Sequence, residues 1–445
     1  MIRRALAALS LSLSVLLLAA LPARAIDIQQ VTSPQGIKAW LVEDHSIPFV
    51  AIEIAFRGGA SVDAPGKRGA VHLMTALLEE GAGERDAVAY AEAMEALAAS
   101  AAFDVSDDAV MVGFRTLTEN RDAAADLLAD ALARPRFDAD AVERVRAQAL
   151  SVIRSQDSDP GSIAAIEMAK RMWGDHPYGS PLTGTAESVS ALTRDDLAQA
   201  HASVIARDRV IVSAAGDIDA ESLGLLLDRI LGGLPAQATA PLPPRPQLQL
   251  TGATTVIDWD SPQTVVRFAQ AGLPLDDPDY FAAVVLNHIL GGGGFSSRLM
   301  DEIREKRGLT YGVGTSLSNQ VLGDSWGGGM ATANDRTAEA VALVREIWGT
   351  IRDGVTEQEL ADAKTYLTGE YPLRFDGNRR ISGILTGMQL MDMPPDYINT
   401  RNDRVRAVTA EDVHRVAQRM LDPKALEFVL VGRPSGIDST AQAAQ

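Results

Sequence analysis

Six histidines are the only side chains in this chain that offer imidazole chemistry, and no cysteine accompanies them. The absence of cysteine excludes disulfides, thiolate metal sites and cysteine nucleophiles. Metal binding or acid–base catalysis by imidazole would therefore have to use His45, His72, His176, His201, His288 or His414.

A second group of candidate residues lies in the glycine-rich segment 290–311, which reads LGGGGFSSRLMDEIREKRGLTY. The pattern predicts a flexible glycine turn followed by a short helix that begins at Ser296 or Ser297. Gly308 is expected to end this helix in the left-handed conformation. Leu309–Val313 is then expected to form a strand.

Arg304 and Tyr311 stand seven residues apart in this segment, on either side of the expected glycine corner. One would come from the end of the helix and the other from the strand, so both could point at one spot. The alternative is that Arg304 pairs with a nearby acid and Tyr311 packs in a sheet. The four glycines either let an extended peptide approach the backbone or make the turn tight.

The segment Phe56–Leu78 resembles the zinc-site region of the insulinase, pitrilysin and mitochondrial processing peptidase family. In that family the inverted motif H-x-x-E-H lies on a helix, the histidines bind zinc, and the glutamate activates the metal-bound water. The corresponding residues here are His72, Thr75 and Ala76. The family's third ligand would fall near 151–153, which reads Ser-Val-Ile. Because a catalytic zinc needs three protein ligands, the resemblance implies a degenerate site and no metal in this chain.

Structural roles are expected for the other polar residues near this site. His72 is expected to be hydrogen-bonded or solvated at the start of the helix. Glu79 and Glu80 are expected to form the solvated end of the helix rather than to replace the zinc ligands. The run Asp175–Gly179 contains proline and glycine, so we expect a structural turn there.

The glycine-rich segment resembles the second-domain signature of the same family, in which an arginine and a tyrosine face the zinc across the substrate chamber. The resemblance implies that Arg304 and Tyr311 are catalytic residues that hold substrate carbonyls near a zinc ion. The expected substrate-binding residues are Gly292, Gly293, Gly294 and Phe295, together with Arg304 and Tyr311.

The chain divides into five expected parts. Residues 1–25 have the pattern of a cleaved secretory signal, and the alternative is an uncleaved membrane anchor. The proline-rich segment 235–250 is expected to link a domain over 26–234, with the degenerate zinc site, to a domain over 251–435, with the Arg/Tyr pair. Residues 436–445 are small and polar and are expected to form a disordered tail.

The two halves have the pattern of a duplication. Each ends with a helix introduced by a threonine, followed by a strand that ends in glycine. The same number of residues separates Thr193 from Gly216 and Thr409 from Gly432. A tandem pair of related domains is therefore predicted.

Within each half, strand-like segments come in pairs and so do helical segments, which predicts an α+β fold with mainly antiparallel sheets packed with helices. The resemblance implies that the two domains form half of a clam-like peptidase chamber. The predicted strands include Val50–Phe56, Ala109–Phe114 and Val265–Phe268, and the predicted helices include Asp122–Ala133, Asp140–Ser155, Ala338–Asp353 and Glu357–Leu367.

The net charge and the leader pattern together limit where the protein can be located and which partners it can bind. The formal net charge is −18, and removal of the leader takes it to −21. A nucleic-acid partner is excluded because phosphate binding needs clustered Lys and Arg. The leader indicates a periplasmic or exported protein with no membrane span after cleavage.

The resemblance implies a zinc-free subunit of a heterodimeric periplasmic metallopeptidase, inactive alone. Its partner would be a zinc-binding subunit with H-x-x-E-H, and the substrate a peptide or unfolded protein. No cofactor is expected in this chain, and zinc is expected in the partner. One alternative is a non-catalytic peptide-binding or scaffold protein derived from the peptidase family. Another is a hydrolase that uses residues not yet singled out.

Overall fold

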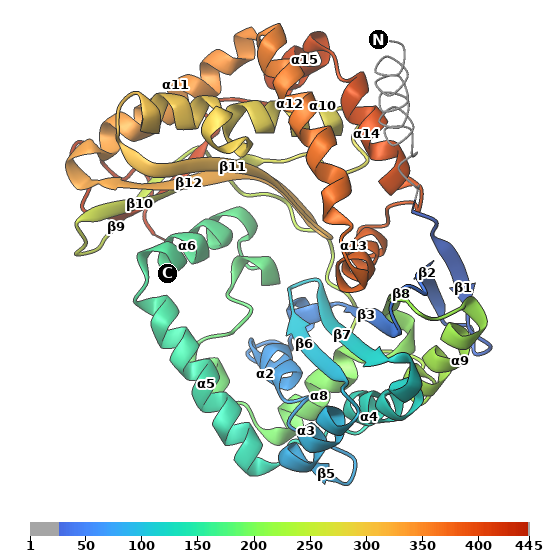
Figure 1. The fold of residues 1–445 in the computed structure, drawn as a ribbon. Coiled ribbons are helices and arrows are strands. Elements are labelled where there is room, and N and C mark those ends of the chain that lie inside the picture. The colour runs from blue at the N-terminus through green and yellow to red at the C-terminus, as the bar shows by residue number, and fades with distance from the viewer. Residues whose placement is uncertain (1–25, 444–445) are drawn as a thin grey trace, which may run out of the picture.

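The computed structural model describes residues 26–443, which form two domains of mixed helices and mainly antiparallel sheets (Figure 1). The α+β class predicted from the sequence is therefore confirmed. The predicted leader, 1–25, and the last two residues lie outside the described part of the chain. No described helix combines the length and the apolar character that crossing a membrane requires.

The two main sheets share one topology, which explains the repeated sequence pattern. The first sheet has the strand order β1-β2-β8-β3-β7-β6 and the second has β11-β12-β10-β13-β9. If β1 is set aside, the five strands of each sheet are arranged in the same way relative to their order in the chain. In each sheet the first of these strands pairs in parallel with the last, β2 with β8 and β9 with β13. The other neighbouring strands pair antiparallel. The strands are β1 Gln29–Thr32, β2 Lys38–Glu43, β3 Phe49–Arg57, β6 Ser100–Val105, β7 Ala109–Leu117, β8 Val210–Gly216, β9 Thr254–Asp258, β10 Gln263–Ala271, β11 Thr310–Gln320, β12 Gly323–Ala333 and β13 Glu427–Gly432, with a small hairpin of β4 Gly81–Ala82 and β5 Arg85–Asp86.

Helices cover the sheets, and the helix that precedes the last strand of each sheet begins with the same cap. Thr193 and Asp196 form a capping box at α8, and Thr409 and Asp412 form its counterpart at α15. Each box satisfies backbone N–H groups that the first helical turn leaves unpaired. The helices are α2 Ala70–Ala76, α3 Ala87–Ala96, α4 Arg121–Ala133, α5 Ala139–Asp157, α6 Pro160–Trp173, α7 Ala186–Ser190, α8 Arg194–Val204, α9 Ala220–Leu231, α10 Tyr280–Asn287, α11 Thr337–Thr350, α12 Glu357–Glu370, α13 Asn378–Leu390, α14 Tyr397–Ala407 and α15 Ala410–Met420.

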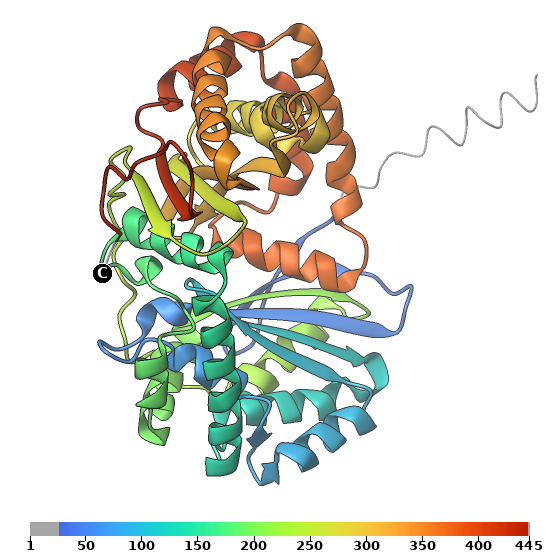
Figure 2. The same ribbon diagram turned by 90° about the vertical axis from the view of Figure 1, so that its left-hand side faces the viewer.

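Each domain places one helix on the sheet of the other domain. Helix α6 of the first domain packs on β10 and β13, and helix α13 of the second domain packs on β3 and β8. Figures 1 and 2 show both helices in the layer between the two sheets. Met168 of α6 lies in an apolar cluster with Val429 and Val431 of β13. This reciprocal exchange joins the two cores into one body.

Buried polar contacts fix the same interface. The Arg171 guanidinium on α6 donates to the Glu427 carboxylate on β13, which also accepts the backbone N–H of Thr251 at 2.9 Å and of Ala253 at 3.0 Å. Burial alone would raise the pKa of Glu427, but these hydrogen bonds and the Arg171 charge bring it below its usual value. The carboxylate is therefore held ionised between the domains.

The predicted linker and tail are both attached to the domains. Residues 235–250 contain no helix or strand, and Arg245 forms an ion pair with Asp324 of the second domain. In the tail, the Thr440 N–H donates to the Thr254 carbonyl at 2.8 Å and the Val256 N–H donates to Ser439 Oγ at 3.0 Å. This part of the segment predicted to be disordered, 436–445, is in fact bound along β9.

Candidate functional site

The degenerate zinc motif lies on α2, a short helix fixed by the backbone at its start. Gly69 precedes it with a φ of 93°, a conformation that favours glycine. The Asp63 carboxylate accepts the N–H groups of Gly69 at 2.9 Å and of Val71 at 2.8 Å. Burial nevertheless raises the pKa of Asp63 to about 6. The helix is thus positioned by side chains that are not zinc ligands.

Two of the three motif positions have no group free to bind zinc. Thr75 is only 1% exposed, and its hydroxyl donates to the Val71 carbonyl at 2.8 Å. Ala76 has no ligand atom. Near the third family position, Val152 is exposed on α5 and Ile153 is buried in the core. Within residues 26–443, no three His, Asp or Glu side chains are grouped so that they could hold a metal ion. The residues present therefore do not fit zinc.

His72, the one remaining ligand, is partly buried. Its Nδ1 atom has no solvent exposure and no hydrogen-bond partner within the described chain. The expectation that His72 is hydrogen-bonded or solvated is therefore wrong for this nitrogen. Burial lowers the pKa of the imidazole, and the Asp104 carboxylate opposes that shift. The neutral ring is favoured because protonation would bury a charge.

The glycine turn of the second domain is tight because its backbone is crowded. Residues 288–292 form a π-helical turn that continues α10. A Cβ on Gly292 would lie 2.6 Å from Asn287 Nδ2, and one on Gly293 would lie 2.7 Å from the His288 carbonyl. Gly294 has a φ of 58°, with open space around it. The tight-turn interpretation thus accounts for Gly292, Gly293 and Gly294.

The helix after this turn agrees with the prediction in its bounds and differs in its N-terminal cap. Helical structure runs from Arg298, and Met300–Glu305 is π-helical. Ser297 stands at the predicted start, because its carbonyl accepts the Asp301 N–H at 3.0 Å. Its hydroxyl, however, donates backward to the Gly294 carbonyl at 2.7 Å and makes no capping hydrogen bond. Gly308 ends the helix with a φ of 61°, as expected.

Arg304 and Tyr311 lie on either side of that glycine corner. The Arg304 guanidinium lies over the Phe295 ring, 4.4 Å from its centroid, and pairs with Glu305 at 3.0 Å. Tyr311 is 89% exposed because β11 has an irregular register between Thr310 and Val313. Within the described chain no hydrogen bond joins Arg304 to Tyr311. The pair therefore flanks the turn without a direct polar contact.

A shallow groove of about 640 Å³ runs beside the glycine turn over the strands β10, β11 and β12. Much of its lining is glycine, so an extended chain could approach the strand backbones closely. Phe295 stands exposed on the same turn. The groove is lined by Val265, Val266, Arg267, Gly291, Gly292, Gly294, Val313, Gly314, Thr315, Ser316, Gly328, Gly329, Met330 and Ala331.

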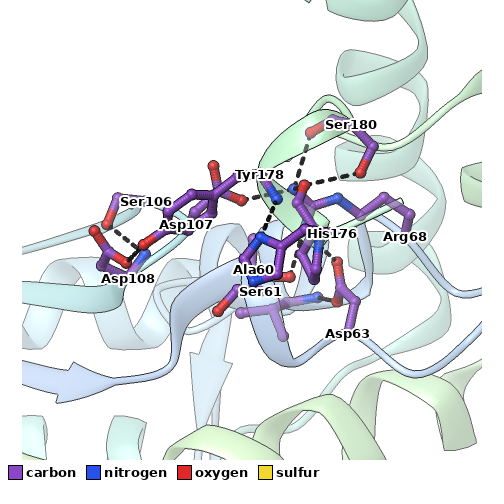
Figure 3. Close-up of polar contacts among 12 residues, drawn as sticks. Ala60, Ser61, Asp63, Arg68, Ser106, Asp107, Asp108, His176, Tyr178 and Ser180 are labelled. Carbon is purple, nitrogen blue, oxygen red and sulfur yellow. Dashed lines mark hydrogen bonds and ion pairs between the residues drawn. The ribbon is translucent and has the colours of Figure 1, made fainter. Parts of the chain in front are cut away.

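The run Asp175–Gly179 forms the expected turn and also joins the two domains. The Tyr178 hydroxyl donates to Asp108, in the turn between β6 and β7 (Figure 3). On the other side it accepts the Leu322 N–H at 3.1 Å, and Asp108 accepts the Val321 N–H at 3.1 Å. The tips of the β6–β7 and β11–β12 hairpins therefore meet at one tyrosine.

The same turn also holds the segment that leads into α2. Arg68 pairs with Asp107 at 2.6 Å and donates to the carbonyls of Pro177 and Ser180, both at 3.0 Å (Figure 3). No local sequence pattern predicts this network, because its members lie far apart in the chain. The one local indication is Tyr178 itself, which stands between a proline and a glycine. In such a turn the tyrosine hydroxyl has few nearby hydrogen-bond partners, so a distant partner could be expected.

Comparisons with known proteins agree with this architecture. Residues 38–186 match the model described as Insulinase (Peptidase family M16), and residues 191–367 match the model described as Peptidase M16 inactive domain. The chain is 29% identical over 395 residues to a Helicobacter pylori protein named non-peptidase homolog YmxG, covering 87% of this chain and 90% of that one.

Two solved structures have the same fold. A peptidase M16 inactive domain from Pseudomonas fluorescens aligns with a TM-score of 0.84 and 30% identity, over 93% of this chain and 100% of that one. The periplasmic protease PqqL from Escherichia coli aligns with a TM-score of 0.78 and 15% identity, over 92% of this chain and 46% of PqqL. From the matched models, the relatives and the fold, this chain belongs to peptidase family M16, as a member without the residues of a zinc site.

Proposed function

We propose that this chain is the zinc-free subunit of a heterodimeric periplasmic M16 peptidase. In this proposal it binds extended peptide and places Arg304 and Tyr311 at the zinc site of a partner that carries H-x-x-E-H. The observation that carries this proposal is a contrast between two segments. On α2 no residue but His72 can bind metal, whereas in 290–311 Tyr311 is exposed and Arg304 is partly exposed. The chain by itself is a catalytically inactive protein derived from a peptidase.

The exposure of Tyr311 and the weak interactions that hold Arg304 support a role toward a second molecule. Tyr311 has 89% of its surface accessible, and Arg304 is held only by a surface carboxylate and an exposed ring. Surface ion pairs are worth about 0–1 kcal/mol, so the guanidinium can leave Glu305 at little cost. Once water is excluded by a partner, both donors would strengthen toward a developing oxyanion.

The periplasmic location is supported by the leader pattern at 1–25. The protease PqqL, whose fold this chain shares, is itself described as periplasmic. Export through a cleaved leader would place both subunits in the same compartment.

A second candidate function is a peptide-binding or scaffold role without catalysis. The observation that favours it is that Arg304 is already engaged by Phe295 and Glu305 and shares no hydrogen bond with Tyr311 within residues 26–443. The relative from Helicobacter pylori named as a non-peptidase homolog supports the same alternative.

Reconstitution tests the proposal directly. The purified chain is mixed with an H-x-x-E-H family member from the same source, and cleavage of a quenched fluorescent peptide is followed. We expect cleavage only when both proteins are present, and we expect a chelator to abolish it. Arg304→Ala and Tyr311→Phe should each lower kcat about 100-fold, because each removes a donor to the oxyanion.

Arg307→Ala is the matched control, because Arg307 is an exposed arginine of the same segment that pairs with Glu302. This variant should leave kcat unchanged. Peptidase activity from this chain alone that a chelator abolishes would contradict the proposal. A mixture that is active but indifferent to both site variants would favour the scaffold role.

A further inference from the structure

The glycine groove of the second domain contains one charged side chain, and that side chain has no partner. Arg267 of β10 is the only charged residue among those that line the groove of about 640 Å³. It is exposed, and within residues 26–443 its guanidinium forms no ion pair and no hydrogen bond. Arg304 and Tyr311 do not line this groove, so Arg267 is separate from that pair.

The register of the sheet places Arg267 beside two glycines. Arg267 pairs with Gly329 of β12, and Gly329 pairs with Gly314 of β11, so the three residues lie side by side on one face. A Cβ on Gly329 would lie 3.2 Å from Arg267 Cδ, so the arginine stem runs close over this glycine. Because the two glycines have no side chains, the floor of the groove beyond the stem is backbone that a ligand can approach.

This face of the sheet is turned toward the first domain. Ala269 follows Arg267 by two residues on β10, so the two side chains lie on the same face. Ala269 packs in an apolar cluster with Met168 of α6. Figure 1 shows α6 on this side of the sheet and α10, α11 and α12 on the other side. A ligand at Arg267 would therefore bind on the side where the two domains face each other.

The first sheet has a charged residue at the position equivalent to Arg267. Glu53 of β3 pairs with Ser213, three residues before the glycine that ends β8. Arg267 of β10 pairs with Val429, three residues before the glycine that ends β13. On its other side each charged residue has a glycine neighbour, which is Gly113 in the first sheet. The duplicated fold therefore carries opposite charges at one position of its two sheets.

The two equivalent positions differ in whether a counter-charge is supplied. Arg379 of α13 lines the same small pocket as Glu53, about 30 Å³ in volume. Burial raises the pKa of Glu53, and the positive charge of Arg379 opposes that shift. At Arg267 the groove is open, and none of the described residues that line it is a carboxylate. The second sheet thus lacks the counter-charge that α13 brings to the first sheet.

We propose that the groove binds an extended peptide through an aspartate or glutamate side chain that pairs with Arg267. A guanidinium offers two parallel N–H groups that match the two oxygens of a carboxylate. The glycine floor lets the peptide backbone come close enough for a short acidic side chain to reach the guanidinium. The inference rests on the proposed peptide binding and adds a substrate class, peptides with an acidic residue at one position.

The charge of the whole chain determines the conditions under which this contact can be measured. The formal net charge is −18, so an acidic peptide is repelled at long range. At an ionic strength of about 0.15 M this repulsion is screened beyond about 8 Å, whereas a direct contact in the groove is screened less. Binding is therefore measured at this ionic strength.

The test uses the purified full chain and labelled ten-residue peptides, blocked at both ends, that differ only at one central position. One peptide carries glutamate there and the other carries glutamine, its neutral counterpart. Binding is followed by fluorescence anisotropy. We expect the glutamate peptide to bind about fivefold more tightly, because one partly exposed charge-assisted contact forms. A third peptide, with glutamine at the centre and a free C-terminal carboxylate, tests for recognition of a chain end.

Arg267→Gln should abolish the preference and leave the affinity for the glutamine peptide unchanged, which also shows that the variant is folded. Arg267→Lys should retain part of the preference, because an ammonium group keeps the charge but loses the paired contact. Arg154→Gln is the matched control, because Arg154 is an exposed arginine of α5 whose guanidinium forms no ion pair within the described chain. This control removes the same charge outside the groove and should keep the full preference.

Equal affinity of the wild-type chain for the glutamate and glutamine peptides would overturn the acidic preference while leaving peptide binding intact. A preference that persists in Arg267→Gln would also overturn it, because another group would then recognise the acid. Tighter binding of the free C-terminal carboxylate than of the internal glutamate would overturn side-chain recognition in favour of a chain end. Failure to bind any of the three peptides would overturn both this inference and the peptide-binding part of the proposed function.

Discussion

The α2 motif and the 290–311 segment differ in what their side chains contact. On α2, Thr75 is buried and hydrogen-bonded to its own helix, so the position of the family's catalytic glutamate is part of the core here. In 290–311, Tyr311 remains in solvent and Arg304 is held only by exposed neighbours. One region has become structural, and the other still has side chains available to a second molecule.

This difference bears on how a peptidase fold loses its own chemistry. A zinc site depends on three side chains held in one geometry, so the loss of two leaves nothing useful. The positions can then be filled by residues that pack. The role proposed for Arg304 and Tyr311 depends on accessible side chains and on the glycine corner at Gly308, and both are present. Variants of α2 should therefore change stability, whereas variants of the Arg/Tyr pair should change activity with the partner.

The largest effect on stability is expected for Thr75→Glu, which would restore the catalytic residue type of the family. The new carboxylate would be buried at a site that is 1% exposed and has no cation, so we expect a loss of about 3 kcal/mol or more. Urea unfolding measures this loss. Thr75→Val, which keeps the volume and removes one hydrogen bond, should cost only about 1 kcal/mol.

The same comparison predicts that metal binding cannot be restored on α2 alone. Isothermal titration of Thr75→Glu combined with Ala76→His should show no zinc binding, because α5 provides no third ligand near Ser151. Tight zinc binding by this double variant would show that another residue completes the site.

Tyr178→Phe is expected to have the next largest effect, on the junction between the two regions. The change leaves the Leu322 N–H and one side of Asp108 without their partner, so the free energy of unfolding should fall by about 1–3 kcal/mol. Thermal and urea unfolding should both show the loss. Tyr366→Phe, which alters an exposed tyrosine, should leave stability unchanged.

A smaller effect is expected on the pH dependence of stability. The pKa of His72 is lowered in the folded state by burial, so between that pKa and about 6.5 the unfolded chain binds more protons. Stability from the neutral imidazole is therefore present above about pH 6.5 and is lost as the pH falls through the folded pKa. His72→Phe should make the free energy of unfolding flatter over this range.

The matched control for this pH effect is His414→Gln, on the exposed face of α15. We expect the pH profile of the control to follow the wild-type profile. An unchanged slope in His72→Phe would show that other groups cause the acid sensitivity.

The smallest effect is expected for Tyr311→Ala. Because the ring is 89% exposed, its removal should change the free energy of unfolding by less than about 0.5 kcal/mol. The large loss predicted for the reconstituted peptidase would then be functional, not structural. A substantial loss of stability would show that Tyr311 packs against the chain in solution.

Much of the fold could be predicted because it depends on local patterns. The threonine caps at Thr193 and Thr409 have short-range signals, and Thr356 begins α12 with the capping box that its sequence suggests. Gly308 ended its helix as expected because a left-handed residue is a local requirement. The duplication followed from the repetition of these signals.

The features that could not be predicted depend on contacts between distant segments. Ser297 has a good capping side chain, but the tight glycine turn offers it the Gly294 carbonyl instead. Ser439 and Thr440 belong to a polar tail, and the edge of β9 gives both of them partners far away in the chain. The opening of β11 at Tyr311 depends on its register with β12 and has no signature in the segment itself.

The exchange of α6 and α13 has a consequence for the order in which the protein can be made. Residues 378–390 are synthesised long after β3 and β8, so the face of the first sheet that they cover stays bare while the second domain emerges. The first domain is therefore incomplete as a folding unit, although its sheet is formed by its own residues. A chain that ends before α13 would present an uncovered sheet, the kind of surface on which aggregation begins.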